Sequence, residues 1–314
     1  LAMELAAAWG PVHTCEEVAS EIEHNLDILA TALRNVPARH RSLRAAFEPS
    51  WGLLSEPERA ALCRLSLFHG TFAAEAAEHL TGAPSKTLAA FVDKSLLRRD
   101  SAGCYEMHRL LQQFAHEALH TDPVERQRAE DHFCDYYSRF LHEREGWLWG
   151  SRQAEALAAI AATIDNARLM WHLAIARADL ASLGRALTSL GMFYAIRCWN
   201  EEGARAFGQA AGCLGTPQQD VVLGQLLAWQ GYFAHQLGQH RDAQALLERS
   251  LDLLRPHPCP QETGFSLYAL GQIHCHGHND YPQAERCFSQ SLALYEAESD
   301  GHGYGRAQAL DGLG

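Results

Sequence analysis

The densest group of potential metal ligands in this 314-residue sequence is His274-Cys275-His276-Gly277-His278, with Asp280 close by. Imidazole and thiolate groups are side chains that a transition metal such as zinc accepts. The segment is expected at the end of a helix, where consecutive side chains diverge by about 100°, so His274 and Cys275 point in different directions. We therefore expect a polar helix end and assign no metal site, with metal binding by this cluster as the alternative.

The nearest match to a phosphate-binding loop is the stretch Gly82-Ala83-Pro84-Ser85-Lys86-Thr87. Such a loop requires one Gly immediately before the Lys and another six residues before it, and these positions hold Ser85 and Leu80. We expect a helix N-terminus capped by Ser85 instead. No Ser-His-Asp or Cys-His arrangement has a spacing that indicates a nucleophile, so we expect no catalytic residues and no enzyme activity in this chain.

The composition is typical of a folded protein without a general nucleic-acid surface. Apolar residues make up 47% of the sequence and charged residues 20%, which is ordinary for a soluble protein. The net charge of −12 argues against phosphate binding, which needs clustered Lys and Arg. Nine cysteines form no C-x-x-C pair, and we expect a reduced, cytoplasmic protein. No apolar run approaches the roughly 18 residues that would span a bilayer.

Helical spacing of Leu and Ala runs through almost the whole chain, and one strand signal stands out between Leu96 and Met107. There, two short strand-like runs flank the turn-forming sequence Asp100-Ser101-Ala102-Gly103, which predicts a β-hairpin. Ser55-Glu56-Pro57-Glu58 has the S-x-x-E pattern of a capping box and predicts a helix through about Leu67. Further helices are expected over 72–80, 85–94 and 108–119.

Three helices followed by a two-stranded wing is the plan of a winged-helix domain, which we place, with the helix after it, at 41–120. Residues 121–178 are predicted to form a helical adaptor that includes helices over Arg126–His142 and Ile164–Ala178. The charged cluster Glu143-Arg144-Glu145 between them is expected to be a solvated face.

Internal repetition dominates the rest of the chain. Leu190-Gly191, Gln230-Gly231 and Leu270-Gly271 are 40 residues apart, and each pair is followed by a small and then a bulky residue, at Gly203 and Phe207, Ala243 and Leu247, and Ala284 and Phe288. This pattern is typical of tetratricopeptide (TPR) hairpins, whose usual period is about 34 residues. We predict an all-α fold with one small hairpin, ending in a TPR-like α-solenoid over 179–314. The region holds about three repeats and the start of a fourth, and we expect the native chain to continue, because a solenoid that stops there exposes an apolar face.

Several short motifs, and above all their order, resemble those of the signal-transduction ATPases with numerous domains (STAND). The resemblance is to the NB-ARC branch of this class and to its bacterial members. Leu1–Trp9 resembles a helix of the ARC region, which we place at 1–40, and Arg39–Arg44 resembles the start of the winged helix. Leu96–Arg98 resembles the first strand of the wing, and Tyr105–His108 lies at the position of the family's Met-His-Asp motif. Ile164–Arg168 resembles the adaptor helix. The resemblance implies a nucleotide-binding domain upstream of Leu1 that binds ADP or ATP with Mg²⁺.

In this family the motif histidine contacts the β-phosphate of ADP, and the resemblance assigns that role to His108. A histidine at a helix N-terminus can offer an N–H donor beside a positive dipole end, and both favour phosphate. Arg109 replaces the usual acid, which removes that acid's contact, although an Arg can itself reach phosphate.

The resulting functional expectation is a regulatory sensor. Its TPR surface would bind a protein, peptide or small-molecule signal, and its winged helix would relay that event to an ADP-locked nucleotide domain. The expected partner-binding residues face inward from the first helix of each repeat: Arg185, Tyr232, His235, Gln236, Tyr268, Gln272 and His276.

The alternative is a transcription regulator whose winged helix binds DNA. Residues 41–120 contain nine Lys or Arg and nine Asp or Glu, and the expected recognition helix carries only Lys86 and Lys94. Base readout favours Arg, Asn or Gln along an exposed face, so the sequence favours the sensor.

Overall fold

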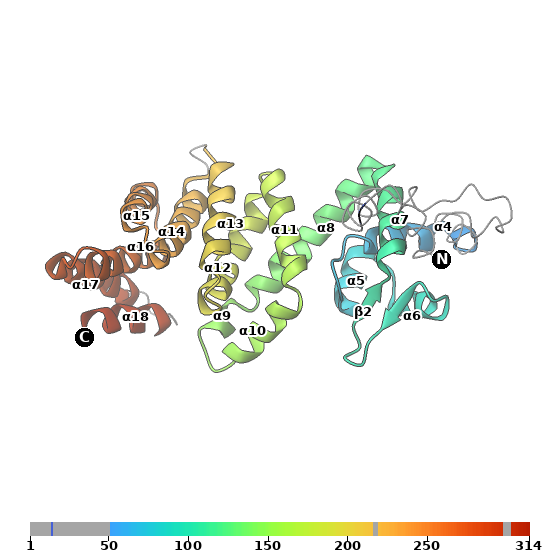
Figure 1. Cartoon of the computed structure of the whole chain (residues 1–314), viewed down its shortest axis with the longest axis horizontal. Helices are drawn as coiled ribbons and strands as arrows, with labels where there is room; N and C mark the ends of the chain where they lie inside the picture. The colour runs from blue at the N-terminus through green and yellow to red at the C-terminus, as the bar shows by residue number, and fades with distance from the viewer. Residues whose placement is uncertain (1–13, 15–50, 216–218, 298–302) are drawn as a thin grey trace. The chain divides into compact units, whose positions relative to one another are not determined.

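The computed structural model describes residues 14, 51–215, 219–297 and 303–314. The expected ARC-like region at 1–40 and the motif at Arg39–Arg44 lie outside this described part. The chain divides into two compact units, Leu1–Tyr136 and Tyr137–Gly314, and the division falls within one long helix. The described part is helical apart from one small hairpin, as predicted (Figure 1).

The described portion of the first unit contains helices around a two-stranded sheet. The elements in order are α4 (Glu56–Leu65), α5 (Ala74–Thr81), α6 (Ser85–Asp93), β1 (Leu97–Arg99), β2 (Tyr105–Met107), α7 (Arg109–His120) and the beginning of α8 (Pro123–His142). β1 and β2 pair antiparallel with Leu97 opposite Met107. The carboxylate of Asp100 accepts the backbone N–H of Cys104 at 2.8 Å, and Gly103 adopts a φ of 86°, so the turn forms at the predicted residues.

The helix expected to begin at Phe72 starts at Ala74 instead. Phe72 forms an isolated β-bridge with Tyr105, in which each backbone N–H donates to the other residue's carbonyl, at 2.9 and 2.8 Å. The Phe72 ring stacks on Phe68 with centroids 4.3 Å apart. Pairing with β2 therefore holds Phe72 in an extended conformation, a non-local effect that helical periodicity does not reveal.

Two helix starts show how local hydrogen bonds set the element boundaries. Glu58 accepts the backbone N–H of Ser55 at 2.8 Å, as the capping-box pattern predicts, and binds Lys94 at 2.6 Å. These contacts, that of Lys94 first, lower the pKa of Glu58 to about 2. At α6 the predicted cap is wrong: Pro84 is the N-cap, and Ser85 is the first helical residue, with its hydroxyl donating to Glu78.

The second unit is a series of helices from the end of α8 to α18. They are the end of α8, α9 (Glu145–Leu148), α10 (Gln153–Ala162), α11 (Ile164–Ala176), α12 (Leu180–Ile196), α13 (Asn200–Gly212), α14 (Asp220–Gln236), α15 (His240–Leu254), α16 (Pro260–Gln272), the π-helical turn η4 (Ile273–Gly277), α17 (Tyr281–Ala297) and α18 (Gly303–Leu313). Consecutive helices from α13 to α18 pack against one another, which forms an α-solenoid (Figure 1).

The predicted 40-residue register marks close helix crossings. A Cβ added at Gly231 would lie 2.8 Å from Cγ of Leu247, and one added at Gly271 would lie 2.5 Å from the ring of Phe288. Both partners belong to the second helix of the same hairpin. At Gly191 the nearest ring is that of Trp229, at 2.5 Å, in the next hairpin. Glycine at these positions lets the helices touch. At Gly231 and Gly271 the contact is filled by Leu247 and Phe288, each four positions after the small residue of its repeat.

A second repeated crossing lies near the other end of each hairpin. Ser250 donates its hydroxyl to the carbonyl of Gly224 at 2.7 Å, and Ser291 does the same to Gly264 at 2.8 Å. Both serines are fully buried. A buried hydroxyl is tolerated when it is hydrogen-bonded, and here it joins the two helices of a hairpin.

The adaptor helix α11 is joined to the first repeat by an ion pair. The guanidinium of Arg168 binds the carboxylate of Glu202 on α13 through two hydrogen bonds of 2.6 and 2.8 Å. The indole N–H of Trp171 donates to the carbonyl of Ala206 at 3.1 Å. Planar, bidentate Arg–carboxylate pairs add geometric specificity, so these contacts define how α11 meets α13.

Candidate ligand pocket in the helical repeats

A cavity of about 130 Å³ lies in the second unit between α9, α12, α14, α16 and α18. This volume is well above the space that one water needs. The lining residues are Glu145, Trp149, Leu187, Thr188, Gln225, Ala228, Trp229, Gln261, Glu262, Phe265, Tyr295, Tyr304, Gly305 and Gln308. The cavity therefore combines an apolar surface with a few polar groups, which is the usual character of a small-ligand site.

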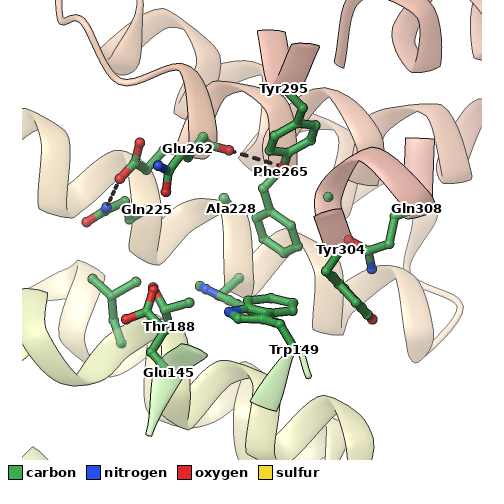
Figure 2. Close-up of a pocket in the computed structure, with 14 residues that line it drawn as sticks. Glu145, Trp149, Thr188, Gln225, Ala228, Glu262, Phe265, Tyr295, Tyr304 and Gln308 are labelled. Carbon is green, nitrogen blue, oxygen red and sulfur yellow. Dashed lines mark hydrogen bonds between the residues drawn. The ribbon is translucent and has the colours of Figure 1, made fainter. Parts of the chain in front are cut away.

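Five aromatic residues in the described part of the chain line the cavity. The rings of Trp149 and Tyr304 lie 4.4 Å apart between centroids, and those of Trp229 and Phe265 lie 4.5 Å apart, both in tilted arrangements. The first pair joins α9 to α18, and the second joins α14 to α16. Figure 2 shows Trp149, Phe265 and Tyr304 at the centre and right of the cavity.

Glu145, Thr188, Gln225 and Glu262 lie on the other side of the cavity, and Gln308 lies beside Tyr304 (Figure 2). The amide of Gln225 donates to the carboxylate of Glu262 at 2.8 Å (Figure 2). A second carboxylate, that of Glu145, lies 3.4 Å from the exposed imidazole of His142, which does not line the cavity. Burial raises the pKa of the Tyr304 phenol above its usual value, so this hydroxyl stays neutral near pH 7.

Helical periodicity explains which side chains reach the cavity. Gln225, Ala228 and Trp229 are spaced three and four residues apart on α14, so they lie on one face. Glu262 and Phe265 have the same spacing on α16. All of them come from the N-terminal half or the middle of the first helix of a hairpin.

The predicted partner-binding residues do not line this cavity, although all but His276, which lies in η4, belong to helices that do. Tyr232 and Tyr268 are half-buried, as are Arg185 and Gln272, whereas Gln236 and His276 are exposed and His235 is buried. Tyr232 lies nearest to the cavity walls, with its ring 5.7 Å from that of Trp229 and 6.0 Å from that of Phe265. On α14 and α16 the pocket residues lie about one or two turns nearer the start of the helix than the predicted set, whereas on α12 Leu187 and Thr188 follow the predicted Arg185. The signal that could have found them is the aromatic pair Trp229 and Phe265.

Glu145 also departs from its prediction. The cluster at 143–145 was expected to be a solvated face, but Glu145 is half-buried and lines the cavity. Its neighbour Arg144 stacks on Phe140, with the guanidinium carbon 3.5 Å from the ring centroid. Only Glu143 is fully exposed, because the chain turns here from α8 into the short helix α9.

His235 faces another histidine. Its Nδ1 lies 3.0 Å from Nδ1 of His240 at the start of the next helix. Burial, followed by the proximity of His240 and His276, lowers the pKa of His235 to about 4. His235 is therefore neutral near pH 7, and its ring and that of His240 are within hydrogen-bond distance of each other.

The His/Cys cluster forms the π-helical turn η4, which continues from α16, and His278 follows it. The rings of His274 and His278 lie 6.0 Å apart, and Nε2 of His278 is 3.1 Å from the amide oxygen of Gln244. Among the described residues, no three His, Cys, Asp or Glu side chains gather as metal ligands would.

His108 lies in the first unit as the N-cap of α7. Its side chain is exposed, and its Nδ1 accepts the backbone N–H of Leu110 at 3.3 Å. In the neutral ring this bond places the proton on Nε2.

Comparison with known proteins identifies the repeats. Residues 224–297, which run from α14 to the end of α17, match the tetratricopeptide repeat family model, so the two hairpins α14–α15 and α16–α17 are TPR units. The predicted first repeat, α12–α13, precedes the matched segment. The comparison with curated proteins finds no significant match.

Among solved structures, the chain is similar to a Signal Transduction ATPase with Numerous Domains (STAND) protein with a tetratricopeptide repeat sensor from Pyrococcus horikoshii. The identity is 16% and the TM-score 0.30, with 99% of this chain and 55% of the other covered. The chain thus spans about half the length of that protein. In the part of the chain that the structure describes, no helix is long and apolar enough to cross a membrane.

Proposed function

We propose that this chain is the regulatory and sensing part of a STAND signalling ATPase, and that its TPR region binds the signal. The observation that carries the proposal is the cavity with five aromatic residues that lies mainly between the first helices of successive hairpins. The signal is a small ligand in this cavity or a protein that inserts a side chain into it.

The relay in this proposal belongs to the first unit, acting as a winged helix. Its three helices and hairpin are followed by His108, and the motif order resembles that of NB-ARC proteins. His108 would donate from Nε2 to the β-phosphate of ADP held by a nucleotide-binding domain outside this chain, and Mg²⁺ would accompany ATP there. The chain itself would act in the cytoplasm as a regulator without enzyme activity.

The contacts of α6 favour this role over DNA binding. Lys94, one of the two lysines of the expected recognition helix, binds Glu58 at 2.6 Å. A lysine held by a carboxylate contributes little to binding a phosphate backbone.

A thermal-shift screen of the purified chain against small organic cations, anions, sugars and nucleotides tests the sensor. A ligand at 100 times its Kd stabilises the folded state by about 2.7 kcal/mol, which raises the Tm by several degrees. Thr188→Trp should fill the cavity and abolish the shift, whereas the near-isosteric Thr188→Val should keep it. If no compound shifts the Tm, or if Thr188→Trp responds as the wild type does, this cavity is not the sensor site.

A further inference from the structure

The cavity described above carries an imbalance of charge. Two carboxylates, those of Glu145 and Glu262, lie on its wall, and no Lys or Arg is among the described residues that line it. Glu262 is bound by a neutral amide, that of Gln225. The described wall thus has two acidic side chains and no basic one, and Figure 2 shows the two glutamates on the side opposite Tyr304.

Aromatic rings form another part of the wall. The π-system of an aromatic ring attracts a cation placed over its face, and the attraction is largest for Trp. Trp149 and Trp229 both line the cavity, together with Phe265 and Tyr304. Carboxylates opposite aromatic faces suit a cation that also carries apolar groups.

We propose that this pocket binds an organic ammonium cation with small alkyl substituents. The inference rests on the proposed sensor function and names its ligand class. The alkyl groups pack against Trp149 and Phe265, and the positive charge lies between the rings and Glu262.

Other ligand classes fit the same walls less well. An anion would face two carboxylates without a cation among the described lining residues. A neutral apolar ligand would displace water from the carboxylates and offer them neither a hydrogen-bond donor nor a positive charge, which is costly. A bare metal ion needs several oxygen, nitrogen or sulfur ligands, and the described residues gather no such group.

Three probes of nearly the same shape separate these classes by charge. Choline is the cation, 3,3-dimethylbutan-1-ol is its neutral analogue, and 3,3-dimethylbutanoate is the anion. Calorimetry on the whole chain should show choline binding at least about tenfold more tightly than the alcohol, with the anion weakest.

Variants assign the binding to the pocket. Glu262→Gln and Trp149→Ala should each weaken choline binding by about five- to thirtyfold, and Glu262→Gln should leave binding of the alcohol unchanged. Glu285→Gln is the matched control, because Glu285 is exposed on α17 and does not line the cavity. Circular dichroism and the Tm of each variant establish that it is folded.

The outcomes separate this inference from the sensor function. Equal or tighter binding of the alcohol, or no choline binding in the millimolar range, overturns the cation assignment. Choline binding that both variants leave intact also overturns it, because the site then lies elsewhere. If choline fails while another compound gives a thermal shift that Thr188→Trp abolishes, the sensor function stands and only the ligand class is wrong.

Discussion

His108 contributes to this chain through a single cap bond, because its ring is exposed and accepts only the N–H of Leu110 in the contacts described above. Replacing it with Ala should therefore change the free energy of unfolding of this chain by no more than about 1 kcal/mol. In the full-length protein, the proposed phosphate contact is worth about 1.5–3 kcal/mol. His108→Ala should then weaken ADP binding by about tenfold to a hundredfold and raise signal-free activity.

Urea unfolding of the chain and calorimetry of ADP with the full-length protein measure the two effects. His120→Ala is the control, since His120 is exposed at the other end of α7. A large loss of stability in the chain, with unchanged ADP affinity, would mean that His108 is structural.

His235 predicts a pH dependence of stability in the second unit. Its pKa is about 4 in the folded protein because it is buried and near His240 and His276, and about 6.5 in the unfolded chain. Between these values the unfolded chain binds a proton that the folded chain does not, so stability falls as the pH is lowered from about 6.5 to 4.

Replacing His235 with Gln should remove part of this dependence. From pH 7 to pH 5 the wild type should lose about 1 kcal/mol more than the variant, after solvent screening is allowed for. Urea unfolding at both pH values measures the difference. His172→Gln, at an exposed position of α11, should lose as much as the wild type; if His235→Gln does so too, His235 does not cause the dependence.

At the scale of elements, the hairpin crossings are the sharpest feature. A Cβ at Gly231 would lie 2.8 Å from Cγ of Leu247 and 3.2 Å from the carbonyl oxygen of Ala243. The backbone of α15 cannot move aside as a side chain can. Gly231→Ala should therefore destabilise the protein by about 1–3 kcal/mol, although Ala is the better helix former.

Gly212→Ala is the matched control for this change. Nothing lies within 4 Å of a Cβ at Gly212, so this substitution should be neutral or stabilise α13 by up to about 1 kcal/mol. Chemical denaturation of both variants compares them. Equal effects at the two positions would show that α14 and α15 do not touch at Gly231.

At the scale of the whole molecule, we expect the chain to bind ATP weakly, with a Kd well above the micromolar range, and not to hydrolyse it. The sequence around Lys86 has Ser85 and Leu80 where a phosphate-binding loop needs Gly. Calorimetry with ATP and Mg²⁺, together with a phosphate-release assay, tests this. Sub-micromolar binding with turnover would contradict the regulatory role proposed for the chain.

The sequence by itself determined the features that depend on neighbours close along the chain. The hairpin turn follows from Asp100 and Gly103, the start of α4 from Ser55 and Glu58, and the repeated crossings from small and bulky residues at a constant spacing. These patterns could be read because turn chemistry and helical periodicity are local. The phosphate-contact role of His108 stays a prediction that depends on a resemblance.

Only the tertiary structure decided where the cavity lies and what lines it. Glu145, Thr188, Glu262 and Tyr304 come from four helices that are far apart in the sequence, and no spacing links them. The same limit applies to Phe72, whose extended conformation depends on Tyr105. Trp229 and Tyr232 lie on the same face of α14, so periodicity does not separate them. Trp229 lines the cavity because its turn of the helix meets different neighbours from the turn that holds Tyr232.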